Sequence, residues 1–234
     1  MKISGIIVAA GSGKRMGKLL PKQFITIAGR SIVSYTIENV SKCINLIELI
    51  LVIPEGYDTN KLPKDIQNKV DVPVKIIQGG PERQFSVYNA LKNVSNDADS
   101  ILVHDGVRPF VSQSLLKKLI NELKNCDGVF PGLSPKETIK EINKNLVIKT
   151  RDRSKLVSVQ TPQIFKKEIL LKAYNYAIRN NIIGTDDAYL VEKIGGKVKV
   201  IPGEEINIKI TTPIDLEIAE IIIKKGIFHE FQNR

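Results

Sequence analysis

The stretch that most constrains the fold runs from Ile6 to Met16, where an apolar run gives way to small residues. Its first part, Ile6–Val8, is β-branched and apolar, which is typical of a buried strand. The small residues that follow, Ala9–Gly13, allow the backbone to approach a ligand closely. Successive backbone N–H groups in such a turn form a concave anion site. The stretch therefore predicts a strand that ends in an anion-binding loop.

Cations follow this loop, among them Lys14, Arg15 and Lys22. A loop of small residues with cations nearby suits a polyphosphate, whose charge must be neutralised before a phosphorus centre is attacked. The spacing excludes the Walker loop, which needs four residues between its first Gly and its Gly-Lys pair. It also excludes the dinucleotide fingerprint, because Met16 stands where that motif needs a third Gly.

Strand-like and helix-like patterns alternate along the chain, which predicts an α/β fold: one Rossmann-like, mostly parallel sheet flanked by helices, in a single domain of residues 1–234. Pro131 is expected at a sheet edge or bulge, and residues 205–210 are expected to form a strand with Asn207 and Lys209 on its polar face. The predicted strands cover residues 3–9, 47–53, 74–77, 100–104, 128–132 and 197–201. The predicted helices cover 31–42, 87–94, 112–123, 170–177 and 185–195, with a last one from Pro213.

The pattern changes near residue 137, where two alternating runs, Glu137–Ile142 and Leu146–Thr150, flank the turn Asn143–Asn145. This arrangement predicts a β-hairpin. Because the hairpin interrupts the strand–helix order, we expect it to project from the core as an arm of about residues 135–155. A two-stranded arm is only marginally stable alone in water. We therefore expect it to pack on a second copy of the chain, in a homodimer.

The charge and composition of the chain argue against several classes of function. The net charge of +10 is spread along the chain without a basic block interleaved with aromatics, so we expect no nucleic-acid partner. The two histidines, His104 and His229, argue against a histidine triad or a multi-histidine zinc site, which leaves oxygen ligands and Mg²⁺. No apolar run is long enough for a membrane span, and Cys43 and Cys126 lack metal spacing. We expect a cytoplasmic protein without a membrane partner.

Asp105 follows the predicted strand 100–104. In open α/β sheets the ligand crevice lies outside the carboxyl ends of the strands, so Asp105 is the candidate Mg²⁺ ligand. The Gly79-Gly80 turn enters a predicted helix, where backbone N–H groups can meet a ligand.

Several motifs together resemble a known family. Ala-Ala-Gly-x-Gly-x-Arg-Met followed by Pro-Lys-Gln is similar to the nucleotidyltransferases that make sugar nucleotides. Within that group the chain resembles the 2-C-methyl-D-erythritol 4-phosphate cytidylyltransferase family of the non-mevalonate isoprenoid pathway. The further motifs are Gly-Gly-x-x-Arg-x-x-Ser-Val at 79–87, His-Asp-x-x-Arg-Pro at 104–109, Gln-Thr-Pro-Gln-x-Phe at 160–165 and Asn-Ile-Lys-x-Thr-x-Pro at 207–213.

The resemblance implies a Mg²⁺-dependent cytidylyltransferase that acts on CTP and a sugar-alcohol phosphate. It also implies a role for particular residues of this chain. Catalytic roles fall to Arg15, Lys22, Arg153 and Lys209. Nucleotide binding falls to Ala9, Ala10, Gly11, Gly13, Gly80, Arg83 and Ser86. Acceptor binding falls to Asp105, Arg108, Thr138 and Thr185, with Thr138 and Arg153 supplied by the arm to the partner's site.

In the implied reaction, an acceptor phosphate oxygen attacks the α-phosphorus of CTP and pyrophosphate leaves. Two alternatives stay open. A ribitol-5-phosphate cytidylyltransferase is similar through the same motifs, and a non-catalytic nucleotide- or RNA-binding module would also use the positive charge. The chain departs from the family at Pro81, where Asp is frequent, and at Leu156-Val157, where Leu-Trp is usual.

Overall fold

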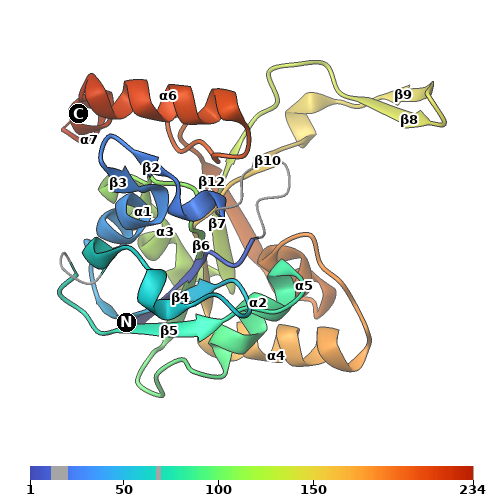
Figure 1. Cartoon of the computed structure of the whole chain (residues 1–234). Helices are drawn as coiled ribbons and strands as arrows, with labels where there is room; N and C mark the ends of the chain where they lie inside the picture. Colours follow the sequence, from blue (N-terminus) through green and yellow to red (C-terminus); the bar gives the residue numbers. More distant parts are fainter. Residues whose placement is uncertain (12–20, 67–69, 234) are drawn as a thin grey trace.

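The computed structural model describes residues 1–11, 21–66 and 70–233, and an eight-stranded sheet forms their centre (Figure 1). The strand order is β10-β7-β11-β6-β1-β4-β5, and β12 pairs with β7. β6, β1, β4 and β5 are parallel, whereas β11 runs antiparallel between β6 and β7. The strands are β1 Ile3–Val8, β4 Leu46–Ile53, β5 Val74–Gln78, β6 Ser100–Asp105, β7 Gly128–Leu133, β10 Ser158–Val159, β11 Gln163–Lys166 and β12 Val198–Pro202.

Helices cover both faces of this sheet, as the sequence predicts for an α/β fold. Side chains alternate between faces along a strand, so Ile3 and Ile7 of β1 pack with α1 and α3, while Ile6 packs with α2, α4 and α5. A third cluster joins α6 and α7 to Phe110 and Ile210. The helices are α1 Ile32–Ser41, α2 Arg83–Leu91, α3 Gln113–Glu122, α4 Lys167–Arg179, α5 Asp187–Lys193, α6 Pro213–Lys224 and α7 Ile227–Gln232. Within the described ranges, no helix is long and apolar enough to cross a membrane.

Side-chain caps fix where several helices begin. Ser112 accepts a hydrogen bond from the backbone of Leu115 and starts α3. Thr212 and Asp215 form a capping box with Pro213 at the first turn of α6, which is the N-terminal signal that the sequence shows. α5 starts at Asp187, two residues after the predicted start at Thr185. Asp186 is the cap, because its carboxylate accepts from the Tyr189 N–H.

Of the two positions expected for Pro131, the sheet edge is wrong, and Pro131 instead lies at an irregularity of the ladder. β7 pairs with β12 along one side and with β11 and β10 along the other. Pro131 is tolerated there because it lies between the pairs Val129↔Ile164 and Gly132↔Val159, where the neighbouring ladder is interrupted. Its missing N–H therefore leaves no strand partner unsatisfied.

Residues 205–210 do not form the expected strand. Their backbone is held by side chains instead: Arg108 and Gln160 both donate to the Asn207 carbonyl, at 2.8 and 3.3 Å. Asn207 is fully buried, whereas the side chain of Lys209 is 40% exposed. The two residues therefore do not share a polar face: Asn207 holds the segment in the interior, whereas Lys209 lines the cavity.

The predicted hairpin is present as β8 Lys140–Asn143 and β9 Leu146–Thr150, which project from the body of the molecule (Figure 1). Lys144 and Asn145 have positive φ angles of 43° and 71°, as a two-residue hairpin turn of type I′ requires.

Candidate active site

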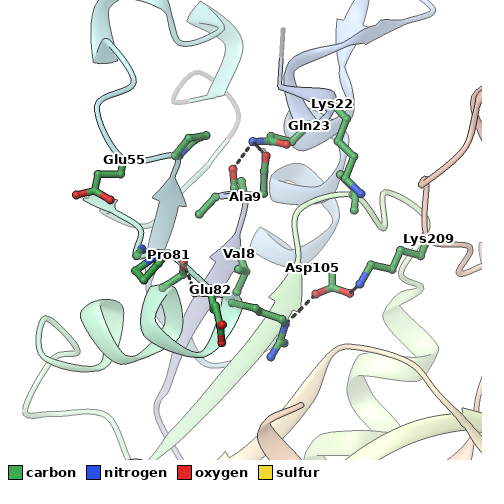
Figure 2. Close-up of a pocket in the computed structure, with 16 residues that line it drawn as sticks. Val8, Ala9, Lys22, Gln23, Glu55, Pro81, Glu82, Asp105 and Lys209 are labelled. Atoms are coloured by element: carbon green, nitrogen blue, oxygen red, sulfur yellow. Dashed lines mark hydrogen bonds and ion pairs between the residues drawn. The ribbon is translucent and has the colours of Figure 1, made fainter. Parts of the chain in front are cut away.

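A cavity of about 550 Å³ opens at the carboxyl ends of β1, β4, β5 and β6 (Figure 2). The four parallel strands end at this edge of the sheet, which is where open α/β sheets bind ligands. The residues that line it are Val8, Ala9, Ala10, Gly11, Lys22, Gln23, Pro54, Glu55, Gly80, Pro81, Glu82, Arg83, Ser86, Asp105, Val107 and Lys209.

The start of the glycine loop forms one wall of the cavity. Ala9, Ala10 and Gly11 line it directly, whereas Gly13 and Arg15 lie outside the described residues. The buried side chain of Gln23 donates to the carbonyls of Ala9 and Gly11. Sequence reasoning gave Gln23 no role, although it closes the Pro-Lys-Gln motif; its function here is to fix the loop backbone that faces the cavity.

The glycine turn before α2 forms the adjoining wall. The Gly80 N–H donates to Ser86 Oγ at 3.1 Å, and that hydroxyl donates to the Glu82 carbonyl at 3.1 Å. A Cβ on Gly79 would lie 2.5 Å from Ala10 Cβ, and one on Gly80 would lie 2.7 Å from Phe85 Cβ. Glycine at position 79 therefore allows the two predicted nucleotide-binding segments to lie against one another, and glycine at position 80 allows the turn to pack on the start of α2.

The charged groups of the site are packed most closely around Asp105, at the end of β6. Its Oδ2 lies 2.8 Å from Lys209 Nζ and 3.5 Å from Arg108 Nε, and its Oδ1 lies 3.4 Å from Arg83 Nε. Burial alone would raise the pKa of this carboxyl, but Arg83, Lys209 and Arg108 hold it well below its usual range. Asp105 is thus a buried anion surrounded by three cations, two of which line the cavity.

His104 lies behind this anion and is fully buried. Its Nε2 faces the Arg108 carbonyl at 3.0 Å, so that nitrogen carries the proton, and Nδ1 accepts from Thr161 Oγ1 at 2.9 Å. Thr161 Oγ1 in turn accepts from the Asp105 N–H at 3.0 Å. Burial lowers the pKa of His104 to about 4. Sequence reasoning assigned no role to His104 or Thr161, although both stand inside motifs that it singled out.

Three predicted site residues do not reach the cavity of their own chain. Thr138 and Arg153 are exposed on the arm, where Arg153 donates to the Lys136 carbonyl at 2.6 Å. Thr185 is exposed before α5. None of the three lines the cavity, whereas Arg108 joins it indirectly through Asp105.

The described part of the chain holds no cluster of three or more His, Cys, Asp or Glu side chains suited to a metal ion. Asp105 is a carboxylate at the cavity, but its two oxygens already contact cations. Mg²⁺ is commonly held by one or two carboxylates together with substrate phosphates. These residues therefore fit an ion held largely by a bound polyphosphate, and they do not fit a resident metal.

The model of the 2-C-methyl-D-erythritol 4-phosphate cytidylyltransferase family matches residues 3–225. The chain belongs to this family. Proteins called 2-C-methyl-D-erythritol 4-phosphate cytidylyltransferase are similar over nearly their whole length. The one from Caldanaerobacter subterraneus is 39% identical over 96% of this chain and 100% of its own. The one from Alkaliphilus oremlandii is 43% identical over 95% of each.

Solved structures of the cytidylyltransferase family share the fold. The 4-diphosphocytidyl-2C-methyl-D-erythritol synthase of Anaerococcus prevotii superposes with a TM-score of 0.83 at 35% identity, covering 95% of this chain and 98% of that one. The 2-C-methyl-D-erythritol 4-phosphate cytidylyltransferase of Thermus thermophilus gives a TM-score of 0.79 at 28% identity, covering 96% and 100%. These matches confirm the α/β fold class and the family that the motifs indicate.

Proposed function

We propose that this chain transfers the cytidylyl group of CTP to 2-C-methyl-D-erythritol 4-phosphate and releases pyrophosphate. A phosphate oxygen of the acceptor forms a bond to the α-phosphorus of CTP, and the bond from that phosphorus to the β-phosphate oxygen breaks. The observation that carries this proposal is the cavity itself, where the glycine loop and three cations, Lys22, Arg83 and Lys209, face the same space. Two polyanions must meet there, and the cations offset their repulsion.

The attacking oxygen is already an anion, so the reaction needs no strong general base. The site agrees with this requirement, because the buried His104 is neutral and both of its ring nitrogens are engaged in hydrogen bonds. The chain positions the two substrates and supplies the positive charge that offsets their repulsion.

Lys22 and Lys209 enter the cavity from different parts of the chain. Lys22 follows the glycine loop and extends into the cavity on the same side as Lys209 (Figure 2). We assign Lys22, with Arg15, to the α-phosphate and the leaving pyrophosphate. Lys209 comes from the far end of the chain, and Asp105 orients its ammonium group. We assign Lys209 to the acceptor phosphate.

Mg²⁺ is the cation that we propose for this enzyme. When bound with CTP it would neutralise part of the triphosphate charge, and Asp105 is the described carboxylate at the cavity best placed to lie beside it. The chain's own contribution is to keep that carboxylate ionised through Arg83, Lys209 and Arg108.

We also propose a homodimer joined through the arm. The arm exposes a run of apolar side chains, with Leu146 at 75%, Val147 at 60% and Ile148 at 60%, and such a run favours burial against another surface. Thr138 and Arg153 would then reach the partner's cavity, which agrees with the finding that neither lines the cavity of its own chain.

Mixing two inactive variants tests this arrangement. Arg153→Ala and Lys209→Ala should each be nearly inactive alone. After unfolding and refolding together, mixed dimers hold one site with both native residues, so about a quarter of the wild-type activity should return. The control is a mixture of the two variants that have been refolded separately, so that it contains no mixed dimers. Absence of any recovery in refolded dimers would contradict the shared site.

The two buried cysteines, Cys43 and Cys126, are unpaired, which agrees with the reducing cytoplasm that we propose as the compartment.

The deciding assay for the function is pyrophosphate release from CTP and Mg²⁺ with either 2-C-methyl-D-erythritol 4-phosphate or D-ribitol 5-phosphate. Release with the first acceptor alone supports the proposal, and release with ribitol phosphate alone overturns the acceptor. RNA binding with a steep salt dependence and no release would favour the binding module.

A further inference from the structure

One guanidinium group joins two buried carboxylates that come from distant parts of the chain. Arg83, the first residue of α2, donates from Nη2 to Asp187 Oδ2 at 2.8 Å and approaches Asp105 Oδ1 through Nε at 3.4 Å. Asp105 lines the cavity, whereas Asp187 does not and is fully buried at the start of α5. The second oxygen of Asp187 accepts from the Tyr174 hydroxyl.

The buried charge of Asp187 is not explained by helix capping. Asp186 already caps α5 and is itself held by Gln163 at 2.9 Å. Burying a carboxylate is costly unless it is paired, and among the described residues the cation paired with Asp187 is Arg83. The pair therefore fixes the position of Arg83 from behind the cavity wall.

The remaining edge of that guanidinium faces no protein acceptor in the described ranges. Arg83 uses Nε for Asp105 and Nη2 for Asp187, which leaves Nη1 as a donor on a side chain that lines the cavity. Burial opposes the charge on Arg83, but Asp187 and Asp105 together raise its pKa, so it stays protonated.

We propose that Asp187 is a positioning residue for the nucleotide: it anchors Arg83 so that Nη1 is presented to a phosphate group of CTP. This inference rests on the proposed function and on the nucleotide-binding role that the family resemblance implies for Arg83. Without Asp187, the guanidinium has Asp105 as its carboxylate partner. It would then turn both of its donor edges toward that group, away from the ligand and in competition with Lys209.

The test compares two variants of the same buried group. Asp187→Asn removes the charge that holds Arg83, while Tyr174→Phe removes the hydrogen bond to the other oxygen and leaves the contact with Arg83. We expect Asp187→Asn to raise the KM for CTP by at least about tenfold, in keeping with the loss of one charge-assisted contact. The KM for the acceptor and the far-UV circular dichroism should change little. Tyr174→Phe should lower the midpoint of thermal unfolding and leave the KM for CTP within about twofold.

A double-mutant cycle then asks whether Asp187 acts through Arg83. In an Arg83→Ala background, Asp187→Asn should add no further rise in the KM for CTP. A full additional rise would overturn the proposal, and so would equal effects of Asp187→Asn and Tyr174→Phe. A lower KM for CTP in Asp187→Asn would also overturn it, because Asp187 would then act only through its negative charge.

Calorimetric titration of CTP separates this inference from the proposed function. If the wild-type chain releases no pyrophosphate with 2-C-methyl-D-erythritol 4-phosphate, the proposed function fails, but the affinity of each variant for CTP still decides the role of Asp187. Weaker CTP binding in Asp187→Asn than in Tyr174→Phe supports the positioning role, and equal binding refutes it.

Discussion

Protonation of His104 should dominate the loss of stability between pH 6.5 and pH 4. The folded chain holds this ring neutral between Thr161 and the Arg108 carbonyl, and burial lowers its pKa from 6.5 to about 4. The unfolded chain therefore binds a proton more readily than the folded chain as the pH falls. The stability linked to His104 is complete above pH 6.5 and is lost progressively as the pH falls toward 4.

The size of this stability loss follows from the lowered pKa of His104. At about 1.4 kcal/mol per pKa unit, a fall from 6.5 to about 4 removes roughly 3 kcal/mol of unfolding free energy between pH 7 and pH 4. This is a large fraction of the 5–15 kcal/mol of a typical domain. Below pH 4 both states are protonated, and His104 adds no further change.

Urea unfolding at constant ionic strength, from pH 7.5 to pH 4, measures this effect. His104→Gln replaces the ring with an amide that does not titrate, so the variant should be less stable at pH 7 but should lose about 3 kcal/mol less on acidification. His229→Gln, at an exposed position of α7, is the control for replacing a histidine by glutamine. Equal acid-induced losses in wild type and His104→Gln would refute the reasoning.

Two further predictions concern the cavity. Gly79→Ala should destabilise the fold by about 1–3 kcal/mol, because its Cβ would lie 2.5 Å from Ala10 Cβ. Gly11→Ala, whose Cβ meets no described residue within 4 Å, should stay within about 0.5 kcal/mol in the same urea titration, and equal stabilities would contradict the packing argument. Lys209→Met should lower kcat by about 10²–10³ with little change in thermal unfolding. Lys136→Met, which removes a pair with Glu205 at 2.6 Å, should keep the wild-type kcat; a fully active Lys209→Met would exclude its assigned role.

The sequence predicts the parts of this fold that depend on local patterns. The apolar run of β1, the alternating arm and the Thr212-Pro213 helix start each follow from residues that are neighbours in the chain. The carboxyl-end rule also placed Asp105 correctly at the edge of the sheet where the cavity lies.

What sequence patterns miss depends on contacts between distant residues. The alternation at 205–210 favours a strand, but Arg108 and Gln160 satisfy the Asn207 carbonyl instead. Pro131 fits an inner strand only because the neighbouring ladder is interrupted there. The contact between Arg83 and Asp187 spans 104 positions of the chain, and no spacing rule brings such residues together.

The ring of cations around Asp105 means that a phosphate ligand would enter this site by exchange. In the chain alone, Lys209, Arg83 and Arg108 share one internal carboxylate, which acts as a tethered counter-ion at high effective concentration. An incoming phosphate must compete with that carboxylate for the positive charge of these side chains. A weakly charged anion such as chloride competes poorly, whereas a group that offers several charged oxygens at once competes well. The carboxylate thereby keeps the cation cluster stable in the absence of ligand and favours polyvalent phosphates over the small monovalent anions of the cell.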